Sequence, residues 1–165
     1  MKLPTAILFL FLGAIVPISC FVKYVEFDQN CGGFLKQAAD ANTVELAKER
    51  IDIAVDYIEK HDLTYGYTSV LWKTEDENVE YWYNNIKACQ RELEQCKNAS
   101  QLEKSNVLLK VRESLTDNGK DGTELTLPDG ISLYPDNAYL GLLRAFSYVL
   151  ILIGVLIFYD WLEEW

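Results

Sequence analysis

Four cysteines and one histidine are the residues of this 165-residue chain that could supply a nucleophile, a base or a soft metal ligand. Cys89 and Cys96 are seven positions apart, so on one helix they would lie about 10.5 Å apart along the axis. A disulfide needs Cα atoms within about 7 Å. No C-x-x-C or zinc-ligand spacing occurs either. We therefore expect thiols that pack as small apolar side chains, with a bridge from Cys31 to Cys89 or Cys96 as the alternative if this segment is exported.

The remaining ionisable groups show no catalytic pattern. His61 lies beside Asp62 at the predicted C-terminus of a helix, where the helix dipole favours a cation. The cluster Glu75-Asp76-Glu77 lacks the alternating oxygen ligands and the glycine of a calcium loop, and we interpret it as a helix start. No Gly-rich phosphate loop, H-E-x-x-H or G-x-S-x-G motif is present. The sequence predicts a protein that is not an enzyme and has no catalytic residue, cofactor or metal.

Two apolar runs enclose these residues. Residues 3–22 contain no charge, and residues 138–159 contain only Arg144. Each run reaches the ~20 residues that a bilayer-spanning helix needs. We therefore assign residues 1–25 to an N-terminal transmembrane anchor and residues 138–165 to a C-terminal transmembrane helix with a short acidic tail.

The first run is also compatible with two other functions. Met1-Lys2 followed by residues 8–15 resembles a cleaved signal peptide, but no A-x-A cleavage pattern follows. Ser19-Cys20 resembles the end of a lipoprotein signal, although Pro17 stands where an aliphatic residue is expected. Signal h-regions are about 7–15 residues long, so the length of this run favours a retained anchor.

The second run carries three candidate interaction residues. Arg144 lies close enough to one end to extend its side chain to the interface; as an alternative it pairs with a polar group on another subunit. Gly141 and Ala145 form a small-x-x-x-small pair that would allow close approach of a second helix. Gly154 lies further along the same run, and Gly13 and Ala14 provide small residues midway along the first run.

The segment between the runs is acidic. Residues 24–137 contain 22 acidic and 12 basic side chains, a net charge of −10. Nucleic-acid binding requires a basic surface, so we expect no nucleic-acid partner. A basic or cationic partner would suit this charge.

Residues 26–116 are predicted to form an acidic bundle of helices. Asn42 with Glu45, Thr74 with Glu77, and Ser100 with Glu103 each have the spacing of a capping box. Behind the second box, apolar residues recur three and four positions apart and form a coiled-coil-like seam: Val79, Trp82, Ile86, Cys89, Leu93 and Cys96. We interpret the seam as the core of an intramolecular bundle, with an intermolecular coiled coil as the alternative.

Residues 117–137 form a turn-rich connector. Apolar and polar residues alternate over 125–127 and 131–133 around Pro128-Asp129-Gly130, which predicts a small β-hairpin or an extended turn. The expected fold is therefore mostly α-helical. Two transmembrane helices flank an antiparallel bundle of three to four helices, with the hairpin or turn before the second span.

Aromatic residues gather near one end of the predicted bundle. Trp82 belongs to the seam, whereas Tyr81 and Tyr83 flank it and Trp72 precedes it in the same stretch. Tyrosine and tryptophan are enriched at interface hot spots, so Trp72, Tyr81 and Tyr83 are candidate interaction residues, with packing in the core and at the end of the bundle as the alternative.

Orientation is weakly constrained, because Lys2 on one side is opposed by Lys23 and Arg144 on the other. Since the first run resembles an export signal, we expect both termini inside and the acidic domain on the extracytoplasmic side. Alkylation of Cys31 in intact cells would test this if Cys31 is reduced and exposed.

These features predict a two-span membrane protein that contacts the lipid bilayer and a protein partner or a second copy of itself. It would act as an accessory subunit, an assembly factor or an interaction module. The alternative is a ligand-binding or sensory module, because the layout is similar to that of extracytoplasmic sensory domains of bacterial receptors. Only six residues follow Tyr159, so such a module would have to signal laterally to a partner membrane protein.

Overall fold

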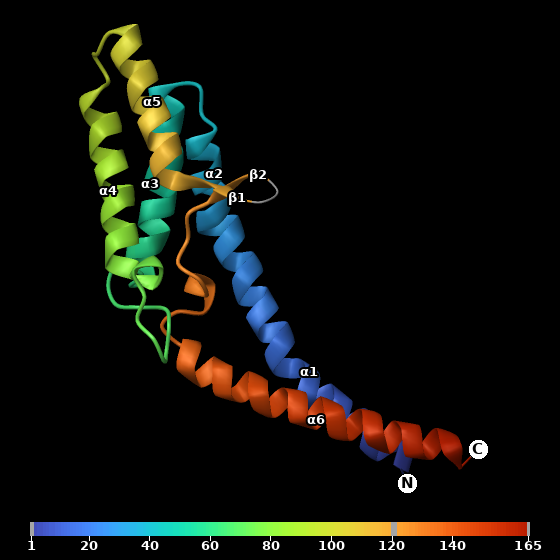
Figure 1. Ribbon diagram of the computed structural model, residues 1–165. Coiled ribbons are helices and arrows are strands. Elements are labelled where there is room, and N and C mark those ends of the chain that lie inside the picture. The colour runs from blue at the N-terminus through green and yellow to red at the C-terminus, as the bar shows by residue number, and fades with distance from the viewer. Residues whose placement is uncertain (1, 120–121, 165) are drawn as a thin grey trace. The chain divides into compact units, whose positions relative to one another are not determined.

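The computed structural model describes residues 2–119 and 122–164 and is mainly helical (Figure 1). The chain divides into two compact units, which we describe separately. The first, here the apolar helix pair, combines Met1–Val25 with Asp136–Trp165. The second, here the bundle, is Glu26–Pro135.

The apolar helix pair consists of α1 (Lys2–Phe27) and α6 (Asn137–Glu163). The most apolar 18-residue stretch of each helix has a mean hydropathy of 2.5 in α1 and 2.3 in α6. Both helices are long and apolar enough to cross a membrane. Only 17% and 11% of the residues in these stretches are buried. A core helix of a soluble fold buries far more of its apolar side chains.

Small residues bring α1 and α6 together. Within the apolar helix pair, the buried residues of α1 recur every seven positions at Ala6, Gly13 and Cys20, and those of α6 are Ser147 and Gly154. A Cβ on Gly13 would lie 2.6 Å from Ile151 Cγ1, and one on Gly154 would lie 2.9 Å from Leu10 Cγ. The helices therefore touch where glycine removes the side chain, as in membrane helix packing.

Ion pairs connect the same helices in antiparallel register. Lys2 contacts Asp160 at 2.8 Å and also pairs with Glu164. Near the other end of the pair, Lys23 contacts Asp136 at 3.0 Å. These contacts tie together residues at opposite ends of the sequence.

The bundle begins in a helix that continues from α1 without interruption. A π-helical turn at Asp28–Gly32 leads into α2 (Gly33–Ala39). Then follow α3 (Val44–Lys60), α4 (Val79–Gln95) and α5 (Gln101–Leu115). The hairpin strands β1 (Thr116–Gly119) and β2 (Gly122–Leu125) precede a 3₁₀ turn at Ile131–Leu133. The expected order of bundle helices and hairpin before the last helix is thus confirmed.

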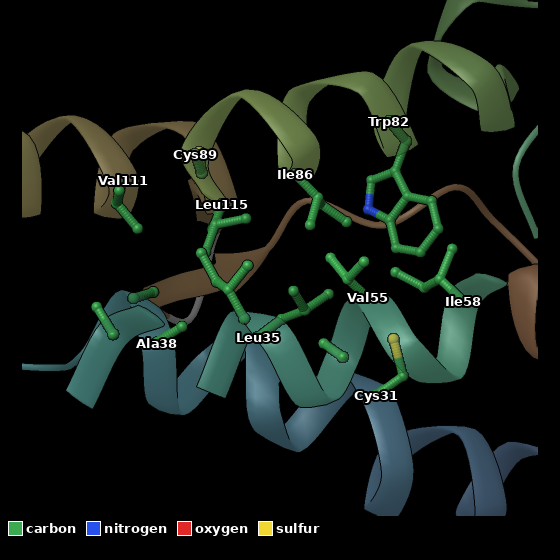
Figure 2. Packing of buried hydrophobic residues seen from close by; sticks show 14 of the residues in the cluster. Cys31, Leu35, Ala38, Val55, Ile58, Trp82, Ile86, Cys89, Val111 and Leu115 are labelled. Carbon is green, nitrogen blue, oxygen red and sulfur yellow. The ribbon is translucent and has the colours of Figure 1, made fainter. Parts of the chain in front are cut away.

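The seam of α4 packs inside the bundle, as the intramolecular interpretation predicted. Val79, Trp82, Ile86, Cys89 and Leu93 are buried in one core cluster, while Cys96 is half-buried. Figure 2 shows Trp82 and Ile86 facing Val55 and Ile58 of α3. Cys31 and Leu35, from the helix that enters the bundle, complete the same core.

Two of the three predicted capping boxes are wrong in detail. Ser100 and Glu103 form the complete reciprocal box at α5. At α3, however, Thr43 rather than Asn42 is the N-cap, and its hydroxyl accepts from Leu46 N at 3.2 Å. The Thr74 hydroxyl instead donates to Glu77 at 2.8 Å across a 3₁₀ turn at Glu75–Glu77, so this cluster does not begin α4.

The residue that caps α4 is Asn78, whose side chain accepts from Tyr81 N at 3.0 Å. Both displaced caps are the short polar side chains closest to the first buried residue of their helix. Burial of Val44 and Val79 therefore determines where α3 and α4 begin, and the polar residue directly before each of them serves as the N-cap.

The predicted hairpin exists, but at other residues. Its strands pair Thr116 with Leu125 and Gly119 with Gly122, not 125–127 with 131–133. Residues 120–121, which follow β1 and precede β2 in the sequence, lie outside the described part of the chain. Ile131 is instead buried in the bundle core from a 3₁₀ turn, which prevents residues 131–133 from forming a strand.

Candidate functional site

A groove of about 810 Å³ opens on the bundle beside α4, and we call it the α4 groove. Three segments that are distant in sequence form it: residues 75–86, the end of α5 with β1, and residues 124–129. The first turns of α4, which begins at Val79, form one side of the groove. The hairpin reverses the chain direction, so that the segment after β2 forms the other side. Thr126 N donates to Leu115 O at 2.9 Å and fixes this return.

The floor of the α4 groove is apolar. Trp82, Ile86 and Leu115 are buried parts of the core cluster, and their outer atoms line the groove. Leu125 and Leu127 are half-buried and pack on the same cluster. An apolar floor that is continuous with the core gives a firm surface for an aliphatic or aromatic group.

The rim of the α4 groove is acidic. Five exposed carboxylates line it, and no lysine or arginine is among the described residues that do so. These acids are Glu75, Asp76, Asp117, Glu124 and Asp129. Like charges around a concave surface add their potentials and attract cations.

The predicted interaction residues fall in different places. Tyr81 lines the α4 groove and is 64% exposed. Tyr83 lies outside the groove lining, half-buried, and donates to Glu59 Oε1 at 2.7 Å. Trp72 also lies outside the lining, on the loop between α3 and α4, and is 75% exposed.

The three candidates on α6 also differ from one another. Arg144 is half-buried, and its side chain lies beside Cys20 of α1. A Cβ on Gly141 would meet no atom within 4 Å, and Ala145 is exposed. Gly13 and Gly154, rather than Gly141 and Ala145, make the close helix contact.

The cysteines are free in the structure. Cys31 is fully buried, and burial raises its pKa to about 12. Burial also raises the pKa of Cys89. These thiols pack as apolar groups, and Cys31 is not exposed enough to report orientation by alkylation. An introduced exposed cysteine is needed for that experiment.

His61 ends α3 as expected. Its backbone N–H donates to Tyr57 O at 3.1 Å, and its ring lies 4.2 Å from the Tyr57 ring between centroids. Asp62 follows with a φ of 56°, the left-handed conformation that closes helices. Among residues 2–119 and 122–164, no group of three or more histidine, cysteine or acidic side chains could hold a metal ion.

The sequence reasoning missed the groove acids at 117–129. The acidic residues of this segment are visible in the sequence, but the sequence does not reveal that the segment lies against α4. That juxtaposition depends on the hairpin and on burial of Ile131. Comparison with protein-family models, curated proteins and solved structures gave no match to the chain.

Proposed function

We propose that this chain is a membrane-anchored, non-catalytic interaction protein that holds a basic segment of a partner membrane protein in the α4 groove. The observation that carries the proposal is the pairing of an apolar floor with a rim of five carboxylates. A segment with lysine or arginine beside leucine or an aromatic residue would satisfy both surfaces. Interfaces of this kind combine an apolar centre with a charged edge.

The apolar helix pair supports the membrane part of the proposal. Two helices long and apolar enough to span would tether the bundle through both of its chain connections, at Glu26 and Pro135. Tethering also raises the local concentration of any partner in the same membrane. The role proposed is that of an accessory subunit or assembly factor with the bundle on the extracytoplasmic side.

A labelled peptide of alternating lysine and leucine is the direct probe of the groove. We expect it to bind the full chain in detergent and to bind more weakly as salt is added, because exposed charges are screened. The double variant Glu124→Lys with Asp129→Lys should weaken binding by roughly tenfold or more, about 1.4 kcal/mol.

The matched control reverses the same number of charges elsewhere. Asp56 and Glu113 are exposed and lie outside the groove lining. Asp56→Lys with Glu113→Lys gives the same net charge and should leave more of the binding intact. Equal losses in the two double variants would show that bulk charge, not the groove, attracts the peptide.

The natural occupant is identified by purifying the tagged chain from its own membrane. The proposal expects a stoichiometric protein that is lost from the groove variant and kept in the control variant.

A second candidate function is binding of a small amphipathic cation, because 810 Å³ lies within the range of small-molecule pockets. A groove-dependent small molecule without a protein partner would support that sensory alternative.

Orientation is tested with a cysteine that the structure exposes. Leu102 lies at the start of α5 and is 72% exposed. Leu102→Cys in a Cys96→Ser background should react with an impermeant maleimide in intact cells. Reaction only after lysis would place the bundle on the cytoplasmic side.

A further inference from the structure

The loop between α3 and α4 exposes a run of large apolar side chains. Val70, Leu71 and Trp72 are 58%, 77% and 75% exposed. We call these three residues the apolar tip. Consecutive apolar residues this exposed mark an interaction surface, and tryptophan is the residue most typical of the membrane interface.

The base of this loop is fixed, so the apolar tip is presented in a defined way. Tyr67 and Asn78 form an antiparallel bridge. Thr68 N donates to Glu77 O at 3.1 Å, and Val79 N donates to Gly66 O at 3.0 Å. These bonds close the loop below the apolar tip.

The loop lies at the end of the bundle where the chain enters and leaves it. The Tyr134 hydroxyl donates to Tyr65 O at 2.8 Å, one residue before the bundle ends at Pro135. Phe27, one residue after the bundle begins, packs against Tyr57 with ring centroids 6.1 Å apart. Figure 1 shows the α3–α4 loop and the 3₁₀ turn before α6 at the same end of the bundle.

The residues next to the apolar tip carry little charge, although the α3–α4 loop also holds Asp62 before them and Glu75, Asp76 and Glu77 after them. Residues 63–74 contain a single charged side chain, Lys73, in a bundle that is otherwise acidic. Lys73 Nζ lies 5.1 Å from the centre of the Tyr67 ring, beside the apolar tip. An acidic surface is repelled by anionic lipids, whereas the stretch of residues 63–74, with Lys73 as its one charge, is not.

We propose that the apolar tip inserts into the interfacial layer of the bilayer that the two apolar helices cross. The occupant of this surface is therefore lipid, and the bundle has a third membrane contact besides its two chain connections. Interfacial side chains of this type enter about 5–10 Å into the boundary between headgroups and acyl chains. The inference rests on the membrane anchoring in the proposed function.

The test measures lipid contact at single positions of the full chain. Leu71→Cys and Trp72→Cys, each in a Cys96→Ser background, carry an environment-sensitive fluorophore in phosphatidylcholine vesicles. The three native cysteines left are buried, and the Cys96→Ser chain alone gives the background. We expect blue-shifted emission that is quenched by lipid with a doxyl group near the top of its acyl chain.

Two further positions make the result decisive. Leu102 is as exposed as the apolar tip but lies at the opposite end of the bundle, because α5 starts where α4 ends. Leu102→Cys should be quenched by aqueous iodide and not by doxyl lipid. Leu152, exposed on α6, reports the anchoring itself and should be quenched by doxyl lipid.

The possible failures are distinct. Quenching at position 152 without quenching at 71 and 72 overturns the inference and leaves membrane anchoring intact. Blue-shifted but unquenched emission from labelled Leu71→Cys, together with a disulfide between two chains when the unlabelled variant is oxidised with copper phenanthroline, assigns the surface to a second copy instead. No doxyl quenching at position 152 removes the anchoring and the inference together.

Discussion

At the residue scale, Tyr81 and Tyr83 of α4 have different surroundings although they are two positions apart. Tyr81 is exposed at the α4 groove, whereas Tyr83 packs against the core cluster and donates to Glu59. Glu59 also pairs with Lys87 at 3.1 Å, and these two partners, Tyr83 first, lower the pKa of Glu59.

Alanine substitution should separate the two tyrosines. Tyr83→Ala removes packing and leaves Glu59 with one partner, so we expect a loss of about 1–3 kcal/mol in the free energy of unfolding. Tyr81→Ala should change it by less than about 0.5 kcal/mol and should weaken binding of the lysine–leucine peptide. Thermal unfolding followed by circular dichroism gives the first quantity. Similar destabilisation by both changes would place Tyr81 in the core.

Tyr83 also predicts how stability depends on pH. Burial, together with the hydrogen bond to Glu59, raises the pKa of Tyr83 from 10.0 to about 12. The folded state therefore holds this proton more tightly than the unfolded state. The stabilisation is complete below pH 10 and is lost as pH rises through about 12.

Tyr83→Phe should flatten the fall in stability across that alkaline window. Phenolate absorbance of the native protein gives the pKa itself, and urea unfolding at several pH values gives the slope. Cys31, whose pKa is raised by burial from 9.0 to about 12, contributes a fall of the same sign that remains in this variant. An unchanged slope would mean that Tyr83 ionises freely in the folded bundle.

At the scale of the element, the caps of the helices provide a matched comparison. Ser100→Ala breaks the reciprocal box of α5 and should destabilise the bundle by about 1 kcal/mol. Asn78→Ala should have a similar effect at α4. Thr74→Ala should have little effect, because its hydroxyl bonds Glu77 without capping a helix. Thermal unfolding of the three variants tests this, and a large effect of Thr74→Ala would restore the predicted box.

The glycines of α1 and α6 allow a second comparison. A leucine at Gly13 or Gly154 would collide with Ile151 or Leu10, whereas one at Gly141 meets open space. We expect Gly13→Leu and Gly154→Leu to lower the midpoint of SDS-induced unfolding in mixed micelles, since overpacking costs about 1–3 kcal/mol. Gly141→Leu should leave the midpoint unchanged. A drop with Gly141→Leu alone would indicate a different helix contact.

Element types could be predicted from sequence because their signals are local. The seam of α4 is periodic and the two apolar runs are continuous over many residues, and all three segments are helices in the structure. The observed caps and hairpin lie a few residues from the predicted ones, because the sequence offers several neighbouring polar or turn residues for each. Burial of Val44, Val79 and Ile131 in the core determines which of these residues are used. The α4 groove depends on segments about 40 residues apart meeting, for which the sequence holds no local pattern.

At the scale of the whole molecule, charge and apolar surface are segregated. The helix pair is almost uncharged between its terminal ion pairs, and the bundle carries the acidic excess. Within the bundle, acids line the α4 groove while the α3–α4 loop presents the apolar tip. The first surface is the proposed site for a cationic partner, and the second is the proposed site for lipid.

The composition of the core has a consequence for biosynthesis. The core cluster takes residues from Phe27, at the start of the bundle, to Ile131, shortly before its end. A growing chain emerges from the ribosome in sequence order, so α3, α4 and α5 are available before Ile131. The core cluster is therefore complete only once the segment before α6 has been made, and until then the apolar side chains that Ile131 covers are open to solvent.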